Sequence, residues 1–382
     1  MGNNALKTAA KGSVNTLNAL RRRFAPRRVF LYAPDAGPDV ADLEQRIRFY
    51  FGDDIRITHL KSPAPTWLLA HGPVLTFRPK DAPPVPLFQQ ALGVFDVNFR
   101  TNSIEAWNWF DAEVFLNGSP DPAVSRRNYD AWKRRVLAEG HRQATIFGTG
   151  PSLARAIERD WSQDIRLVCN TIVRDAELWH HIAPHAVVAG DGLYHYGPTE
   201  FARTFRADLL KRLRESPDTV FIYPDLFHSL VAREIQIEPE RLIPIRRGTA
   251  HTVHATLKDD FALPALGNVL NQLLLPIACD LSKSVRLWGF DGRAPSDVLF
   301  WSNSNKHSYP ELMHTLREHH PAFFDHFVPA HDPESYVRAV HGDVLEHCLS
   351  QAEQQGWHFE MLHKSWTPTL SRRLAPDVEP AQ

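Results

Sequence analysis

Short, largely apolar runs alternate with amphipathic helical stretches from residue 143 onward in this 382-residue chain. The helical stretches that separate the runs are about 10–20 residues long. This alternation is typical of β-α-β units around a mostly parallel sheet, so we expect an α/β fold with a Rossmann-like sheet. The runs are Ala144–Phe147, Ile165–Val168, Ala186–Ala189, Val220–Tyr223, Leu242–Ile245, Val285–Trp288 and Phe359–Leu362.

Three parts of different character follow from this pattern. Residues 1–28 are basic and amphipathic, and residues 29–140 are expected to form a small α/β accessory region. Residues 141–382 are expected to form the Rossmann-like domain. In the accessory region we expect strands at 29–32 and 55–60 and helices at 41–50 and 126–139, and a proline-rich loop or edge at 63–87.

Charge and composition exclude several classes of protein. The chain has 43 Lys+Arg against 44 Asp+Glu, which argues against a dedicated nucleic-acid binder. Three scattered cysteines fit a reducing compartment, and neither a membrane span nor a signal peptide is evident, so we expect a cytoplasmic protein. Residues 1–28 either rest on an anionic lipid surface at the inner face of the membrane or form a solvated terminus.

Residues that directly follow the runs are the candidate site, because parallel sheets bind ligands beyond the carboxyl ends of their strands. Gly148-Thr149-Gly150-Pro151-Ser152 follow the first run. The glycines permit close backbone approach, and Pro151 begins a helix whose free N–H groups favour an anion. The motif has neither the lysine of a Walker loop nor the third glycine of the dinucleotide fingerprint. It predicts a phosphate site, with a plain tight turn as the alternative.

Further polar or flexible positions follow other runs. Asn170 and Asp191 are either nucleotide contacts or helix caps. Asp291 is either a ligand-facing carboxylate or a turn residue. The positions are Cys169-Asn170, Gly190-Asp191, Gly289-Phe290-Asp291, and Gly267-Asn268 at the start of an apolar helix that runs to Leu281.

Eight histidines lie between residues 307 and 347, but none belongs to a His-Glu-x-x-His pattern, so we expect no metal site there. His331 directly precedes Asp332-Pro333-Glu334, which predicts a helix start. An imidazole fixed at such a point suits a general base. The alternative is a surface or packing residue.

Taken in order, these motifs resemble those of the bacterial sialyltransferases of glycosyltransferase family 42. The resemblance rests on Ile-Phe-Gly-Thr-Gly-Pro-Ser-Leu at 146–153, Cys-Asn at 169–170, Leu-Trp-Gly-Phe-Asp at 287–291, and a histidine before a long helix. It covers about residues 143–365. The first motif is also similar to that of the archaeal-type pterin diphosphokinases.

The resemblance implies a GT-A-like sialyltransferase type of sheet and a metal-independent, inverting transfer that needs no cofactor. The donor would be CMP-activated sialic acid or a related ulosonic acid, and the acceptor a cell-surface glycan such as lipopolysaccharide. The family carries two tyrosines that bind the leaving phosphate, and here Tyr309 and Arg293 are the candidates. The implied roles are phosphate and ribose binding for Gly148, Thr149, Gly150 and Ser152, nucleotide and sugar contacts for Asn170 and Asp191, the donor pocket for Gly267 and Asn268, cytidine binding for Gly289, Phe290 and Asp291, and general base for His331.

Two other functions stay open. A pyrophosphokinase-like enzyme would need Mg²⁺ and therefore converging carboxylates, such as Asp191 and Asp291. A non-catalytic nucleotide-sugar-binding protein would keep the sheet and make no use of His331.

Overall fold

The computed structural model describes residues 27–292, 306–327 and 342–378, except residues 35, 38, 62–71, 80–84, 87–88 and 91. The described residues form two compact units. The first comprises residues 27–119 and 317–327, and the second comprises the remainder. Most of the predicted basic segment, Arg293 and His331 lie outside the described residues.

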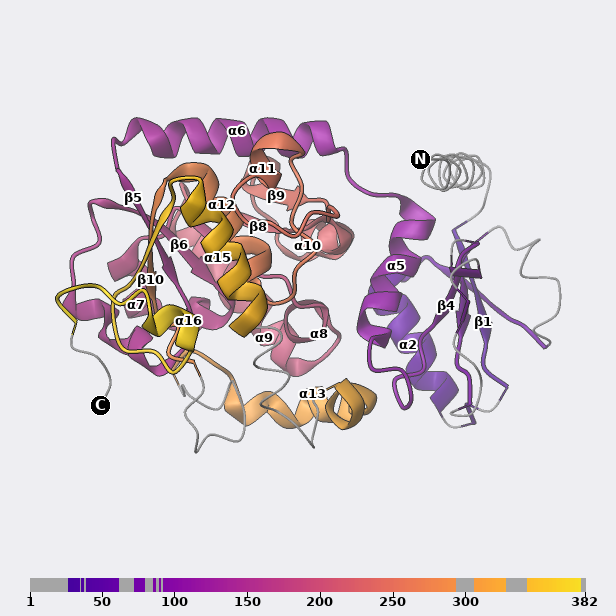
Figure 1. Ribbon diagram of the computed structural model, residues 1–382. Helices are drawn as coiled ribbons and strands as arrows, with labels where there is room; N and C mark the ends of the chain where they lie inside the picture. Colours follow the sequence, from indigo (N-terminus) through magenta and orange to yellow (C-terminus); the bar gives the residue numbers. More distant parts are fainter. Residues whose placement is uncertain are drawn as a thin grey trace, which may run out of the picture. The chain divides into compact units, whose positions relative to one another are not determined.

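The first unit is an α/β unit on a four-stranded parallel sheet of order β2-β1-β3-β4. The predicted strands and helix at its start are confirmed. The proline-rich stretch was expected to be loop or edge, yet β3 lies inside the sheet, because Pro73 and Pro79 flank β3 and leave its ladder N–H groups intact. The elements are β1 (Arg28–Tyr32), α2 (Asp39–Phe51), β2 (Arg56–His59), β3 (Val74–Thr76), β4 (Val94–Asp96) and α5 (Glu105–Asn117) (Figure 1).

Residues 317–327 belong to this first unit although they are distant in sequence. They include the end of α13 (Met313–His319) and the π-helical turn η7 (Phe323–Phe327). The buried imidazole of His320 is hydrogen-bonded through Nδ1 to the buried carboxylate of Glu105. The Ala322 amide donates to the Phe99 carbonyl oxygen at 3.1 Å. These bonds join the segment to the β4–α5 region.

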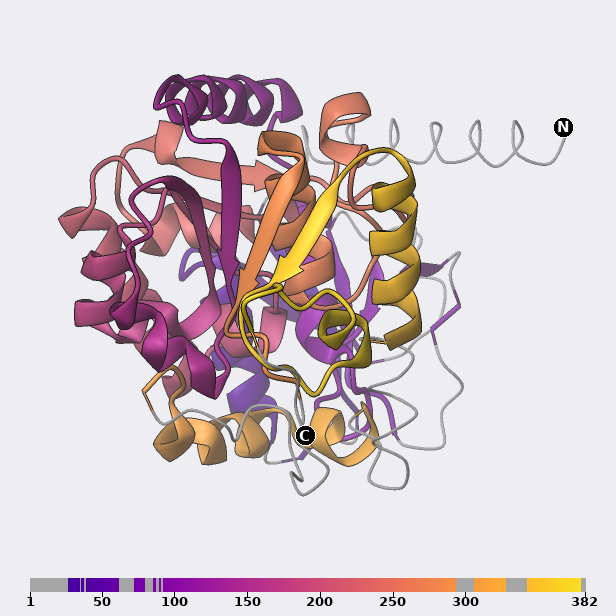
Figure 2. The same cartoon turned by 60° about the vertical axis from the view of Figure 1, so that its left-hand side comes forward.

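The second unit is built on a seven-stranded, fully parallel sheet of order β11-β10-β5-β6-β7-β8-β9. All seven predicted runs are confirmed as strands, and Figure 2 shows β5, β10 and β11 side by side. The strands are β5 (Gln143–Phe147), β6 (Asp164–Cys169), β7 (Ala186–Val188), β8 (Val220–Pro224), β9 (Leu242–Ile245), β10 (Ser284–Trp288) and β11 (His358–Met361).

Helices and short helical turns connect these strands. The helices are α6 (Pro122–Ala138), α7 (Ala176–Ile182), α8 (Gly192–Tyr196), α9 (Glu200–Glu215), α10 (His228–Glu234), α11 (Thr256–Asp259), α12 (Leu275–Leu281), α15 (Val344–Gln354) and α16 (Pro368–Ser371). The turns are η1 (Pro151–Glu158), η2 (Asn170–Arg174), η3 (Asp225–Phe227), η4 (Pro239–Arg241), the π-helical η5 (Leu270–Leu274) and η6 (Pro310–Leu312). None of the helices in the described part of the chain is long and apolar enough to cross a membrane.

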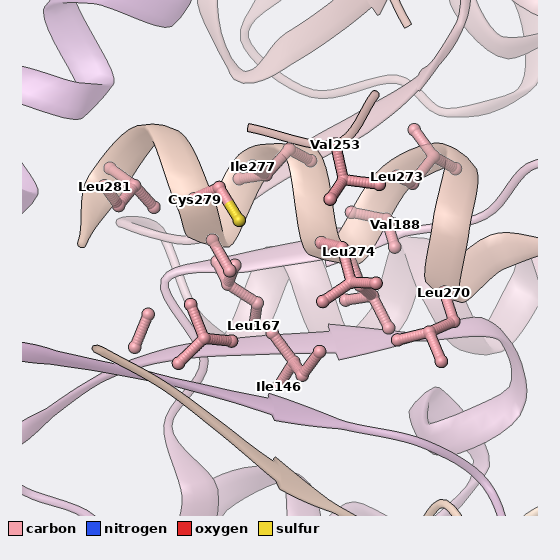
Figure 3. Packing of buried hydrophobic residues seen from close by; sticks show 14 of the residues in the cluster. Ile146, Leu167, Val188, Val253, Leu270, Leu273, Leu274, Ile277, Cys279 and Leu281 are labelled. Atoms are coloured by element: carbon pink, nitrogen blue, oxygen red, sulfur yellow. The ribbon is translucent and has the colours of Figure 1, made fainter. Parts of the chain in front are cut away.

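Strands β7, β8 and β9 bury side chains on both faces, which explains their nearly continuous apolar sequences, whereas β10 and β11 carry partly exposed polar residues such as Arg286 and Glu360. On one face, alternate residues of the strands join a single apolar core with α6, α12 and α15. Figure 3 shows this packing, in which the helix formed by η5 and α12 lies over β5, β6 and β7. The labelled residues include Leu270, Leu273, Leu274, Ile277, Cys279 and Leu281 on the helix and Ile146, Leu167 and Val188 on the strands.

The boundary between the two units lies near residue 120, not at residue 140 as expected. The helix predicted at 126–139 is α6, and it packs on the larger sheet. Its buried side chains Tyr129, Trp132 and Val136 belong to that sheet's apolar core. The Trp132 indole N–H also donates to the His185 carbonyl oxygen at 3.1 Å, directly before β7. These contacts place α6 in the second unit.

Candidate functional site

The strand order identifies a topological switch point in the larger sheet. The chain passes from β5 outward to β9, and then returns to the opposite side of β5 with β10 and β11. In open parallel sheets, ligands bind beyond the carboxyl ends of the strands at such a point. The loops after β5 and β10 contain Gly148–Ser152 and Gly289–Asp291, so the structure brings these two predicted groups together.

Backbone hydrogen bonds join the two loops directly. The Gly148 amide donates to the Trp288 carbonyl oxygen, and the Gly150 amide donates to the Gly289 carbonyl oxygen, both at 2.8 Å. A Cβ atom on Gly148 would lie 2.6 Å from the Gly289 oxygen. Gly289 has φ +76°, a conformation that side chains other than glycine rarely adopt. The glycines therefore allow one loop to approach the other.

Ser152 and Asp291 form the closest polar contact between these loops. The Ser152 amide donates to both carboxylate oxygens of Asp291 at 3.2 Å, and its hydroxyl donates to Oδ1. Ser152 lies in the first turn of the 3₁₀ helix η1, the position expected to bind a phosphate. In this structure the anion at that position is a carboxylate of the protein.

The loop after β11 supports the loop after β10. The Gly289 amide donates to His363 Nε2 at 2.8 Å, and His363 Nδ1 lies 2.7 Å from the Lys364 carbonyl oxygen. This pattern requires the proton on Nδ1 and therefore a neutral imidazole. Burial lowers the pKa of His363, although the Asp291 carboxylate acts against that shift. The sequence interpretation missed His363, although it directly follows the last predicted run.

Asn170 has an unusual backbone and an unpaired oxygen. It follows β6 with φ +51°, a left-handed conformation that asparagine tolerates better than most residues. Its side-chain oxygen is buried and has no hydrogen-bond donor among the residues that the structure describes. A buried amide oxygen normally accepts a hydrogen bond, so this atom is suited to a hydroxyl or amino group of a ligand.

Asp191 caps a helix, one of the two roles open from the sequence. Its Oδ1 accepts the amides of Leu193 and Tyr194 at the start of α8, at 2.9 and 3.0 Å. Its own amide donates to His195 Nδ1 at 3.2 Å. Asp191 follows β7 and Asp291 follows β10, three strand positions apart, or about 14 Å at the usual spacing between strands. That separation argues against one Mg²⁺ held by both carboxylates.

Gly267 and Asn268 precede the buried helix as expected. The start of that helix lies beside the end of β7, which is two strands from β5, so these residues are away from the loops after β5 and β10. Asn268 has φ +57°, and its Oδ1 accepts the Asn271 amide at 2.9 Å, which is a capping interaction. A Cβ atom on Gly190 would lie 3.2 Å from Gln272 Oε1. The start of this helix therefore lies beside the end of β7. Its first turn is π-helical, a form frequent at functional sites.

Tyr309 does not fit the role suggested for it. It is 1% exposed, and its hydroxyl donates to Asp208 Oδ2 at 2.7 Å. Burial, together with this carboxylate, raises the pKa of the Tyr309 hydroxyl. The side chain is a packing residue with a satisfied hydroxyl, which argues against a contact with a leaving phosphate. The other phosphate candidate, Arg293, and the predicted base, His331, lie outside the described residues.

Within the described ranges, one group of side chains has the spacing of a metal site. It consists of Glu139, His141 and His185, near the amino ends of the strands. Both Nε2 atoms lie close to Glu139 Oε2, at 2.9 and 3.0 Å. The Arg166 amide donates to His185 Nδ1, so the His185 proton is on Nε2, the atom that faces Glu139. A metal on Nε2 would require the proton on Nδ1, and the group therefore fits a hydrogen-bonded cluster better than a metal site.

Comparison of the chain with protein-family models, curated proteins and solved structures gives no match. The functional argument therefore rests on the residues themselves.

Proposed function

We propose that the second unit is a glycosyltransferase that uses a CMP-activated donor sugar, sialic acid or a related ulosonic acid, with a cell-surface glycan as acceptor. The observation that carries this proposal is the switch point between β5 and β10. There, Gly148–Ser152 and Gly289–Asp291 meet, and Asn170, directly after the neighbouring strand β6, offers a buried oxygen that has no donor among the described residues. A nucleotide supplies amino and hydroxyl donors for such an oxygen.

The chemistry of a CMP leaving group suits this site. Its single phosphate carries a charge that helix N–H groups can stabilise without a metal ion. In the proposal, Thr149 and Ser152 bind this phosphate and His331 takes the proton of the acceptor hydroxyl. The proposed location is the cytoplasm, with residues 1–28 in peripheral contact with an anionic membrane and with no nucleic-acid partner.

Donor incubation with and without EDTA tests the proposal. Purified protein is given CMP-, UDP- and ATP-type donors, and nucleotide release is measured. The proposal requires CMP release that persists in EDTA, and His331→Ala should abolish transfer while it leaves CMP binding nearly intact. Magnesium-dependent AMP formation would favour a pyrophosphokinase. CMP binding without turnover would favour a non-catalytic nucleotide-sugar-binding protein.

A further inference from the structure

The Asp291 side chain occupies the place where the proposed function puts a phosphate. Its carboxylate accepts the amide and the hydroxyl of Ser152. A Cβ atom on Gly150 would collide with Asp291 Oδ2, so the carboxylate lies directly over the glycine turn. A phosphate and this carboxylate carry the same sign of charge and need the same donors, so both cannot use Ser152 together.

The backbone of Asp291 is anchored independently of its side chain. Its carbonyl oxygen accepts the Trp366 amide at 2.6 Å and the Ser365 hydroxyl at 3.3 Å. The neighbouring Phe290 carbonyl oxygen accepts the same hydroxyl at 2.7 Å. These bonds come from the loop after β11 and do not involve the carboxylate. A rotation of the side chain would therefore release Ser152 while the loop stays in place.

We propose that Asp291 is an autoinhibitory latch: in the free protein its carboxylate binds Ser152, and the donor phosphate displaces it. This inference rests on the proposed function, and it concerns the regulation of the same site. To displace the Asp291 carboxylate, the phosphate must first separate it from the amide and the hydroxyl of Ser152. The affinity for a phosphate-bearing ligand is therefore the affinity of the open site multiplied by the fraction of molecules in which the site is open.

Calorimetric binding of CMP and of cytidine tests the latch, because only CMP carries the phosphate. Asp291→Asn keeps the shape of the side chain but removes its charge. We expect this variant to bind CMP about tenfold more tightly than the wild type, the scale of one close like-charge contact at a partly exposed site. Cytidine affinity should change by less than about twofold, because the nucleoside has no group that competes for Ser152. Glu158→Gln removes one charge at the far end of η1 and should change neither affinity.

A double-mutant cycle supplies a second, independent measurement. Ser152→Ala removes a donor that Asp291 and the phosphate share, so its two effects partly cancel in the wild type. In the Asp291→Asn background the competing charge is gone and the neutral amide oxygen holds Ser152 more weakly, so the loss of the phosphate contact dominates. We therefore expect Ser152→Ala to weaken CMP binding more in the variant background than in the wild type. If Asp291→Asn does not fold, Asp291→Ala replaces it in the cycle.

The outcomes separate the latch from the proposed function. Weaker binding of both CMP and cytidine to Asp291→Asn would make Asp291 a nucleoside contact, and would overturn the latch but not the function. An unchanged ratio of CMP to cytidine affinity would also overturn the latch alone. No binding of CMP or cytidine by any of these proteins would overturn both.

Discussion

We expect Asp96 to lower the stability of the first unit at neutral pH, and its replacement by asparagine tests this. The side chain lies at the end of β4, and burial raises its carboxyl pKa from the ordinary 3.8 to about 6. The Asn98 amide and the Arg78 charge act against this shift, and Glu105 adds to it. The backbone is held in place, because the Asp96 carbonyl oxygen accepts the side-chain amides of Asn102 and Asn108 at 2.7 Å.

The shift fixes the size and the sign of the effect. A folded pKa above the unfolded one means that the native state binds more protons, so this stabilising contribution is full below pH 3.8 and is lost as the pH rises through about 6. Two pKa units correspond to about 3 kcal/mol, and the solvent access that Asp96 retains reduces this to about 1–2 kcal/mol. Asp96→Asn removes the charge and should raise the free energy of unfolding by that amount at pH 8.

Hydrogen exchange measured on peptides from β4 and α5 reports this unit separately from the larger one. Protection should increase in Asp96→Asn at pH 8, and the gain should fall to about a third of that value at pH 4.5, because the unfolded carboxyl is still mostly ionised there. Asp53→Asn, in the exposed turn after α2, serves as the control and should show no pH-dependent difference. An Asp96→Asn variant that is no more stable at pH 8, or one whose gain is the same at both pH values, would refute the reasoning.

Three further predictions concern the second unit. Asn170→Gly should keep the positive φ without strain and weaken CMP binding about tenfold. Asn170→Ala should weaken CMP binding in the same way and also lower the free energy of unfolding by about 1 kcal/mol. Tight CMP binding by the glycine variant would exclude Asn170 as a ligand contact. Burial lowers the pKa of His195 to about 3, so this imidazole stays neutral in the native state. The unfolded chain takes up a proton there as the pH falls below 6.5, so the free energy of unfolding falls by up to about 1.4 kcal/mol per pH unit. His195→Asn should reduce this pH dependence of the free energy of unfolding, measured with urea. An equal pH dependence in the variant and the wild type would contradict a lowered pKa for His195. Zn²⁺ should not raise the melting temperature through Glu139, His141 and His185; a rise that His141→Ala abolishes would show a metal site there.

Local pattern predicts the strands of the larger sheet because β7, β8 and β9 are buried along their whole length, while β10 and β11 alternate between buried and partly exposed residues. It does not predict their order. The position of β10 beside β5 depends on the buried helix at 270–281, which carries the chain from β9 back across the sheet. In the first unit, β3 and β4 have three residues each and are too short to give a periodic signal. Their parallel pairing is visible only in the structure.

The candidate site was predictable in its parts but not in its contacts. The positions that directly follow the strands lie at one edge of the sheet, because the carboxyl ends of parallel strands share that edge. The sequence cannot decide whether Asp191 is a ligand contact or a helix cap, because both roles use the same residue types. The structure shows the cap, since the Asp191 side chain accepts backbone amides at the start of α8. His363 follows a predicted run and could have been found by the same rule. The pairing of Ser152 with Asp291 could not, because 139 residues separate them.

This pairing shows what a glycine turn before a helix can and cannot indicate. Free N–H groups at a helix start favour an anion, but they do not distinguish a ligand from a side chain of the protein. The distinction depends on the neighbouring strand. Phe147 pairs with Trp288 in the sheet, so the turn after β5 and the carboxylate after β10 extend from the same level of adjacent strands. At a switch point built this way, a phosphate ligand would have to compete with that carboxylate. We therefore expect an acidic residue after the partner strand to affect phosphate affinity as directly as the glycines do.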